Sequence, residues 1–314
     1  MREQSQYQLE PVQRHTQYYT PPLTPANSTS WSIEAHELHD VEDSPVFIDG
    51  TVGKVLCKRF QNELVAVKYL YEEVHGVLIQ NKNNKKRFQK KALKWAQLVH
   101  PNVCRFVGAS FDTEGAFLVT EFCSNGNVMN YIRSFPEANL LSLLHQASKG
   151  IQHLHDIKII HSNLKPANIL VHADHRVVIH DQELARLKDD ATMSGSASRH
   201  HIYGNWNYMS PEYLDGQADY PIDVYSFAMS AWQMYTGCVP FSKINWRQLR
   251  QHISSSRPER PGTMSDPLWL LVQRWWAGDP GRRPTFKEIE PSLKAFLEPG
   301  EPLIYSSEYL LSIG

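Results

Sequence analysis

The residues best suited to chemistry lie in the middle of the chain, in a stretch that runs from His161 to Leu170 and reads HSNLKPANIL. It carries a histidine, two asparagines and a lysine. A carboxylate, Asp181, lies 13 residues after Asn168, just beyond a short apolar run. Far upstream, an apolar run ends in Lys68. Amide and carboxylate oxygens are ligands for hard cations such as Mg²⁺, and a lysine ammonium pairs with phosphate oxygens. These groups are the candidates for chemistry if the fold brings them together.

The order of these motifs resembles that of the protein kinase superfamily. HSNLKPANIL is similar to the kinase catalytic loop HRDLKPxNIL, and VAVK at 65–68 is similar to the strand that carries the nucleotide-binding lysine. Four further matches follow in kinase order: the metal motif that begins at Asp181, Ser210-Pro211-Glu212, Asp223–Phe227 and Asp279–Pro284. The wording of these motifs is most similar to the tyrosine-kinase-like group with Ser/Thr-type catalytic loops.

This resemblance implies an α+β, bilobal, protein-kinase-like fold, in which a small antiparallel β-sheet lobe with one main helix precedes a larger, mostly α-helical lobe. Local patterns agree with it. Short apolar runs bounded by turn residues predict strands at 46–48, 54–56, 64–70, 105–110, 116–121, 169–171 and 177–179. Apolar residues at spacings of three and four, with helix start and stop signals, predict helices at 87–99, 140–154, 223–236, 246–253, 267–276 and 285–297.

Composition divides the chain into three parts. Residues 1–44 are rich in Gln, Tyr, Ser, Thr and Pro and show no period, so we expect a disordered N-terminal arm. The kinase-like domain is expected over 45–297, with an N-lobe at 45–122 and a C-lobe at 123–297. Residues 298–314 would form a C-terminal tail.

Several residues stand where kinases bind ATP. Gly50 and Gly53 keep part of the glycine-rich loop, whose backbone N–H groups approach phosphates, although without the other motifs they would indicate a plain hairpin. Ile48 replaces the first glycine of that loop. The resemblance assigns the remaining nucleotide-binding positions to Val55, Ala66, Lys68, Thr120 at the gatekeeper site, Glu121 and Cys123 of the hinge, Asn168 and Asp181.

The catalytic positions are only partly kept. Asn168 and Asp181 match the two metal ligands of kinases, which implies Mg²⁺ as a cofactor. Asn163, however, occupies the position of the aspartate that accepts the substrate proton. An amide is not appreciably basic, and loss of a general base typically costs about 10²–10⁴ in rate. Lys165 matches the residue that contacts the γ-phosphate in Ser/Thr kinases.

Other positions depart from the kinase pattern. Lys91 stands where kinases carry the helix glutamate that holds Lys68, and two ammonium groups about 4 Å apart would repel by about 4 kcal/mol at an effective dielectric of 20. We therefore expect the helix to be displaced outward, with Lys91 in water. Gln182 and Glu183 replace the Phe and Gly of the metal motif, which predicts a stiff, inactive-like conformation. A further hypothesis pairs Glu183 with Lys68 or Lys91.

Three matches predict structural roles. Glu212 and Arg283 match the buried ion pair that anchors the end of the activation segment. Asp223 matches the helix-start carboxylate that holds the backbone of the catalytic loop. His161 is expected to pack and donate hydrogen bonds rather than to do chemistry.

Composition excludes several other classes of function. The chain has 32 Lys and Arg against 33 Asp and Glu, a net charge of −1, which argues against nucleic acid as a partner. No apolar run approaches the roughly 18 residues of a membrane span, and the start lacks the apolar core of a secretory signal. We expect a cytoplasmic or nuclear location, and the four separated cysteines are expected to be reduced thiols.

Two functional hypotheses follow. The first is a pseudokinase, a catalytically impaired kinase-like domain that acts as a nucleotide-binding module, a protein-interaction module, or both. Its partners would be signalling proteins, among them an active kinase. The second is a weakly active ATP-dependent Ser/Thr protein kinase that transfers the γ-phosphate to protein hydroxyls. Because kinase transition states are loose, positioning and metal electrostatics supply much of the rate, which keeps the second hypothesis open.

Overall fold

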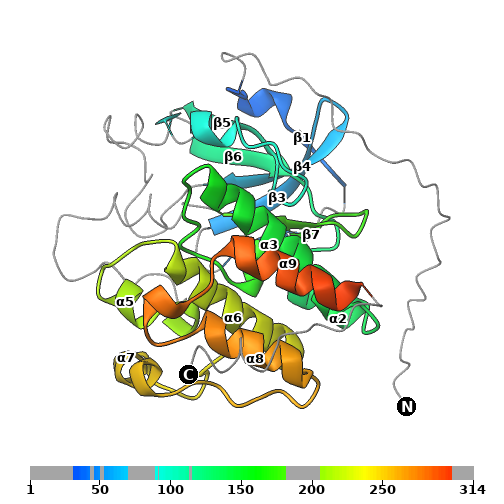
Figure 1. Cartoon of the computed structure of the whole chain (residues 1–314). Coiled ribbons are helices and arrows are strands. Elements are labelled where there is room, and N and C mark those ends of the chain that lie inside the picture. The colour runs from blue at the N-terminus through cyan, green and yellow to red at the C-terminus, as the bar shows by residue number, and fades with distance from the viewer. Residues whose placement is uncertain are drawn as a thin grey trace, which may run out of the picture.

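The structure is a computed structural model, and it describes residues 31–42, 46–49, 53–69, 89–90, 92–112, 115–181 and 206–298. These residues form a β-sheet lobe from the N-terminal part of the chain and a larger lobe of helices (Figure 1). The predicted α+β architecture, with a small antiparallel sheet followed by a mostly helical part, is confirmed.

The sheet has the strand order β1-β3-β4-β6-β5, and β2 also pairs with β3. Its strands are β1 (His39–Asp40), β2 (Val46–Asp49), β3 (Gly53–Phe60), β4 (Glu63–Tyr69), β5 (Phe106–Asp112) and β6 (Gly115–Glu121). Gln61 and Asn62 connect β3 to β4 with positive φ angles of 45° and 69°, as a tight two-residue hairpin turn requires. Alternation along β4 buries Val65 and Val67 on one face and places Lys68 on the other.

The segment before β1 is packed onto the sheet. The N–H of Ile33 donates to the carbonyl of Ala109, whose own N–H donates to the carbonyl of Trp31. Ile33 and Leu38 are buried in a cluster with residues of β4 and β6. Gly108 leaves room for this contact, since a Cβ there would lie 2.5 Å from Cδ1 of Ile33. The prediction of a disordered arm is therefore wrong for residues 31–42. Ile33 and Leu38 are isolated apolar residues without a helical or strand period, so no sequence signal indicates this packing.

The helix predicted over 87–99 is helical at residues 89–90 and 92–95. Ala92 and Trp95, three residues apart and so on one face, are buried, whereas Lys94 is exposed. The Trp95 ring lies 6.2 Å from the ring of Phe106 at the start of β5. Lys91, on which the expected outward displacement of the helix depends, lies outside the described residues.

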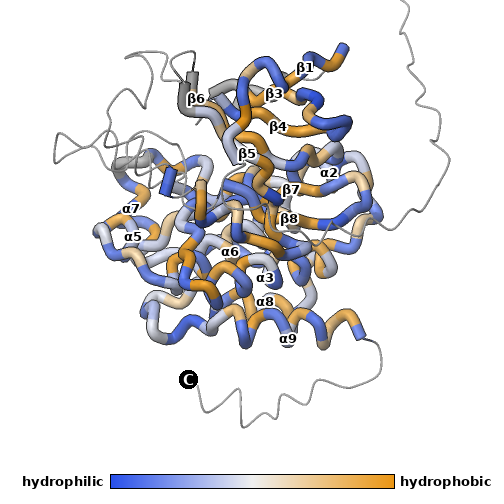
Figure 2. Tube along the Cα trace, turned by 90° about the horizontal axis from the view of Figure 1, so that it is seen from above, coloured by the Kyte–Doolittle hydropathy of each residue, from blue (hydrophilic) through white to orange (hydrophobic). Residues whose placement is uncertain are grey.

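The second lobe is built around one apolar core. Its helices are α2 (Val128–Ser134), α3 (Leu140–Asp156), α5 (Pro211–Leu214), α6 (Pro221–Thr236), α7 (Trp246–Ser255), α8 (Asp266–Trp275) and α9 (Phe286–Leu297). The strands β7 (Ile169–Val171) and β8 (Val177–Ile179) form a small hairpin beside them. α6 is buried along most of its length and packs against α8, while α3 packs against α9 and β8. Figure 2 shows hydrophobic and hydrophilic segments alternating along α9, as expected for a helix with one buried face.

Local residues set the helix ends. The side chain of Asn127 accepts hydrogen bonds from the first turn of α2, and that of Asn139 accepts one from the first turn of α3. Gly237, with φ of 72°, ends α6 in the left-handed conformation that favours glycine. The helices and strands predicted for this lobe are confirmed, with boundaries within two residues of those expected.

Among the described residues, none of the helices has the length and apolar character needed to cross a membrane.

Candidate functional site

The segment that matches the catalytic loop lies between α3 and β7, and a carboxylate of α6 holds its backbone. The backbone N–H groups of His161 and Ser162 donate to the two carboxylate oxygens of Asp223, at 2.7 and 2.8 Å. Asp223 is fully buried. Ser162 has φ of 59°, a left-handed conformation that a serine adopts at a cost, and these two hydrogen bonds help to hold it there. The predicted role of Asp223 is confirmed.

His161 is fully buried and makes two hydrogen bonds that fix its ring. Its Nε2 donates to the carbonyl of His180 at 2.9 Å, and its Nδ1 accepts from the N–H of Asn163 at 3.2 Å. Burial lowers the pKa of His161, so the ring stays neutral at pH 7 with one donor and one acceptor. This geometry fits the structural role predicted for His161.

Asn163 and Asn168 are joined across the same loop. The side-chain amide of Asn168 donates to the carbonyl of Asn163 at 2.7 Å, and the carbonyl of Asn168 accepts from the N–H of His180 at 2.9 Å. Asn168 is buried, whereas Asn163 is half-buried. Because the Asn168 amide nitrogen is occupied, its oxygen is the atom left to bind a cation. These hydrogen bonds fix the conformation of the loop at Asn163, whose side-chain amide is not a base.

Lys68 and Asp181 form a buried ion pair at the centre of the site. The Lys68 Nζ lies 2.6 Å from Oδ2 of Asp181, and their side chains are 5% and 2% exposed. The Nδ1 of His180 lies 3.2 Å from the other carboxylate oxygen. Burial alone would raise the pKa of Asp181, but Lys68, His180 and Lys165 outweigh it and hold that pKa well below its usual range. Asp181 is therefore ionised at pH 7.

The sequence did not predict this pair. The hypothesis drawn from it was that Glu183 pairs with Lys68 or Lys91, whereas the contact seen here joins Lys68 to the metal-motif aspartate. Glu183, Gln182 and Lys91 lie outside the described residues. Lys165 is buried within reach of the Asp181 charge.

Strand pairing in the sheet places several of the residues assigned to nucleotide binding next to one another. Val55 on β3 lies opposite Lys68 on β4, and Ala66 lies opposite Thr120 on β6. Cys123 is buried just after β6. Gly53 begins β3, and Gly50 lies outside the described residues.

A small cavity lies beside the ion pair. It has a volume of about 30 Å³ and is lined by Lys68, Asp181, His180, Thr120, Trp95, Phe106, Leu118 and Cys104. One water molecule needs about 10–15 Å³ of such accessible space, so the cavity suits water rather than a nucleotide.

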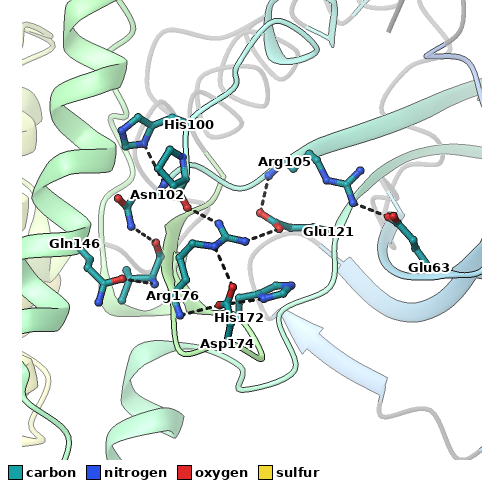
Figure 3. Close-up of polar contacts among 11 residues, drawn as sticks. Glu63, His100, Asn102, Arg105, Glu121, Gln146, His172, Asp174 and Arg176 are labelled. Carbon is teal, nitrogen blue, oxygen red and sulfur yellow. Dashed lines mark hydrogen bonds and ion pairs between the residues drawn. The ribbon is translucent and has the colours of Figure 1, made fainter. Parts of the chain in front are cut away.

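The hinge residue Glu121 uses its side chain to join three segments (Figure 3). One carboxylate oxygen accepts from the N–H of Arg105 at 2.8 Å, and the other accepts from the guanidinium of Arg176 at 3.1 Å. Arg176, on the β7–β8 turn, also donates to the carbonyl of Pro101 and lies near Asp174. The side chain of Glu121 thus ties the hinge to the helical lobe. The resemblance assigned Glu121 to the nucleotide-binding hinge and predicted no such role for its side chain.

The predicted ion pair below the site is confirmed. Arg283 donates to both carboxylate oxygens of Glu212, at 2.5 and 3.0 Å. The same guanidinium donates to the carbonyls of Ala277 and Pro221. The four cysteines are free, as predicted, and the neighbouring Cys123 together with burial raises the pKa of Cys104 well above its usual range.

The residues present fit a metal site that depends on a second ligand. Asn168 supplies one amide oxygen and Asp181 one carboxylate, which suits Mg²⁺ shared with phosphate oxygens. Within the described part of the chain, no group of three or more His, Cys, Asp or Glu side chains could hold a metal ion without such help. Asp181 would have to give up part of its contact with Lys68 or His180 to bind it.

Comparisons with known proteins agree with this geometry. A family profile described as protein tyrosine and serine/threonine kinase matches residues 47–293. The chain is 28% identical over 248 residues, 76% of its length, to serine/threonine-protein kinase STY17 of Arabidopsis thaliana, covering 42% of that protein. It is 29% identical over 253 residues, 78% of its length, to dual specificity protein kinase pyk3 of Dictyostelium discoideum, covering 18% of that protein.

A third similarity is to a tyrosine-specific enzyme. The chain is 28% identical over 255 residues, 78% of its length, to the tyrosine-protein kinase transforming protein Fps of an avian sarcoma virus, of which it covers 46%. The chain therefore spans less than half the length of each of these relatives. The three are named for different hydroxyl specificities.

Proposed function

The chain belongs to the protein tyrosine and serine/threonine kinase family, and we propose that it is a pseudokinase, a kinase-like domain that binds nucleotide and protein partners without efficient phosphoryl transfer. The observation that carries this proposal is Asn163, an amide at the position of the catalytic base. Asp223 and Asn168 hold the surrounding loop through hydrogen bonds, which supports a fixed position for this amide.

The Lys68–Asp181 ion pair supports the same proposal. In a kinase mechanism the lysine contacts phosphate and the aspartate binds Mg²⁺. Here each is neutralised by the other at 2.6 Å in a buried environment. Binding of Mg²⁺ and nucleotide phosphates would have to replace this contact, which makes productive binding weaker than in a site where both groups are turned outward.

A nucleotide would be held by residues that are still in place. Val55 and Ala66 would contact the adenine, the hinge backbone at Glu121 and Cys123 would face its polar edge, and Lys68 would pair with the phosphates. Mg²⁺, when bound with the nucleotide, would be held by Asn168 and Asp181 and would neutralise phosphate charge.

The second candidate is a weak ATP-dependent Ser/Thr protein kinase. It is favoured by Lys165, which is buried close enough to Asp181 to lower the pKa of that carboxyl. A lysine there would stabilise the γ-phosphate of a Ser/Thr-type kinase. Under this proposal, positioning and the metal would supply the rate without a base.

The protein partners would be signalling proteins, including an active kinase, and the site of action would be the cytoplasm or the nucleus. The contacts that Glu212, Arg283 and Asp223 make hold the kinase-like fold together without taking part in phosphoryl transfer. A fold that is kept while the catalytic base is lost supports a binding role.

A nucleotide titration tests the proposal. The melting temperature of the purified chain is measured against ATP and ADP, each with and without Mg²⁺. A nucleotide-binding pseudokinase shows a concentration-dependent rise in melting temperature. No rise with any nucleotide would leave only the protein-interaction role. A Val55→Arg variant, which fills the adenine side with a long cation, serves as the non-binding control.

A further inference from the structure

A second cavity lies in the helical lobe, between α8 and α9. It has a volume of about 290 Å³, and its lining includes Leu271, Arg274 and Trp275 of α8 and Lys287, Ile289 and Pro291 of α9. None of these residues belongs to the site described above. Since a water molecule occupies about 30 Å³ in the liquid, the cavity has room for a segment of peptide chain.

One residue of this lining, Arg274, has a side-chain donor without an acceptor. Arg274 is half-buried, and its Nε is buried and lacks a hydrogen-bond partner among the residues that the structure describes. A buried N–H left unpaired is costly, so a small movement of this side chain that brings the N–H to an acceptor in the cavity is favoured. The acceptor that best matches a guanidinium is a carboxylate.

The opposite wall has an acceptor without its usual donor. Pro291 lies inside α9 and has no N–H. The carbonyl of Lys287, four residues earlier, therefore cannot receive the regular helical hydrogen bond. A donor on one wall and an acceptor on the other match a peptide that carries an acidic side chain, because its backbone N–H and its carboxylate can satisfy both.

The floor of the cavity is apolar. Leu271, Trp275 and Ile289 are buried there. A suitable peptide would therefore combine apolar side chains with an acidic one.

We propose that this cavity is a peptide-docking site and that its occupant is the stretch 299–314 of the same chain. α9, which forms one wall, ends at Leu297, and this stretch begins two residues later. Leu297 lies six positions after Pro291, which is about 9 Å at 1.5 Å per residue. Sixteen extended residues span up to about 50 Å, so the stretch can turn back and reach the cavity.

The composition of the stretch complements the cavity. It contains Glu301 and Glu308 and has neither Lys nor Arg, so its formal charge is −2 from two acidic and no basic side chains. The lining carries Arg274, Lys287 and Glu288. Lys287 already pairs with Asp156 at 3.0 Å, and the carboxylate of Glu288 accepts from the N–H and hydroxyl of Thr285, so Arg274 is the cation on which the proposed match rests. Apolar residues flank each glutamate: Leu303 and Ile304 follow Glu301, and Leu310 and Leu311 follow Glu308. One glutamate would accept from Arg274 while the neighbouring apolar side chains cover the floor.

Photocrosslinking in the full chain tests this proposal. A photoreactive benzoylphenylalanine replaces Leu303 in one preparation and Leu310 in another. Each is mixed with ¹⁵N-labelled protein of the same sequence and irradiated, and the crosslinked peptides are mapped by mass spectrometry. We expect crosslinks within single copies to residues 271–292 from at least one of the two positions.

Three variants sharpen the test. Arg274→Ala should lower the crosslink yield about tenfold or more, because it removes a charge-assisted hydrogen bond. Gln273→Ala, an exposed neighbour on the same helix, should leave it unchanged. The double variant Glu301→Gln with Glu308→Gln should lower the yield as Arg274→Ala does, and it leaves α8 and α9 untouched. Crosslinks to other surfaces, crosslinks mainly between labelled and unlabelled copies, or a yield insensitive to both Arg274→Ala and the glutamate variant would overturn the proposal.

Discussion

The ammonium group of Lys68 lies 2.6 Å from the carboxylate of Asp181, and both side chains are almost fully buried. These are the two groups that would bind phosphate and metal in the proposed site. In the proposed pseudokinase, this contact would have to open before Lys68 could pair with phosphate and Asp181 could bind Mg²⁺.

Breaking this pair from one side should destabilise the fold strongly. Lys68→Met should lower the free energy of unfolding by about 3–5 kcal/mol, because it leaves the buried Asp181 carboxylate uncompensated. Lys68→Met combined with Asp181→Asn should cost less than the sum of the two single variants. Denaturant unfolding measures this cycle. Lys58→Met, which removes a pair with the exposed Asp40, is the control and should cost about 1 kcal/mol or less. Equal losses for Lys68→Met and Lys58→Met would contradict the account.

His100 should make the stability depend on pH below neutrality. Burial, with His153 and Lys149 nearby, lowers the pKa of His100 to about 4, against about 6.5 in the unfolded chain. As pH falls, the unfolded state binds the proton before the folded state does. The contribution of His100 to the free energy of unfolding is therefore fully present above about pH 6.5 and is lost as pH falls from that value to about 4.

The measurement is denaturant unfolding at pH 7 and pH 5. Between them the wild-type chain should lose about 1 kcal/mol more than His100→Asn, a figure reduced for the partial exposure of the ring. His100→Asn keeps an acceptor for the N–H of Asn102, which now donates to the ring. Identical pH dependence of the two proteins would show that His100 is not the titrating group.

The N-terminal segment should be released by adding one carbon at Gly108. In Gly108→Ala, the new Cβ would lie 2.5 Å from Cδ1 of Ile33 and 2.6 Å from the carbonyl of Trp31, and backbone cannot yield as a side-chain end can. Amide hydrogen exchange should therefore rise at residues 31–40. Gly262→Ala, where the Cβ meets nothing within 4 Å, is the matched control. Unchanged protection of residues 31–40 in Gly108→Ala would refute this packing.

Arg176 should contribute more to the free energy of unfolding than Arg105, although both belong to the same network of polar contacts. Arg176→Ala leaves the buried carboxylate of Glu121 with one fewer cationic donor and should cost about 2–3 kcal/mol. Arg105→Ala removes the exposed pair with Glu63 but keeps the backbone N–H that donates to Glu121, and it should cost about 1 kcal/mol or less. Thermal and denaturant unfolding compare the two, and the reverse order would be inconsistent with the network in Figure 3.

Much of the scaffold was predictable because its signals are local or belong to motifs. The strands and helices follow from period and turn residues. The roles of Asp223 and of the Glu212–Arg283 pair could be predicted because these residues belong to short motifs whose order and spacing match those of kinases.

The remaining contacts were not predictable because tertiary packing sets them. Lys68 and Asp181 are 113 residues apart, and Glu121 and Arg176 are 55 apart, so no local pattern relates their side chains. The kinase resemblance placed Lys68 and Asp181 in one cleft but not on each other. Ile33 was missed because its burial depends on a glycine in a distant strand.

The central claim is that the amide of Asn163 cannot replace a catalytic carboxylate. Its most direct test is transfer of radiolabelled γ-phosphate from ATP to a generic protein substrate and to the chain itself, with Mg²⁺ and with purified protein. We predict transfer no faster than that of the Lys68→Ala variant, and little gain from Asn163→Asp alone while Lys68 and Asp181 remain paired. Robust, Mg²⁺-dependent phosphorylation that Lys68→Ala abolishes would contradict the account.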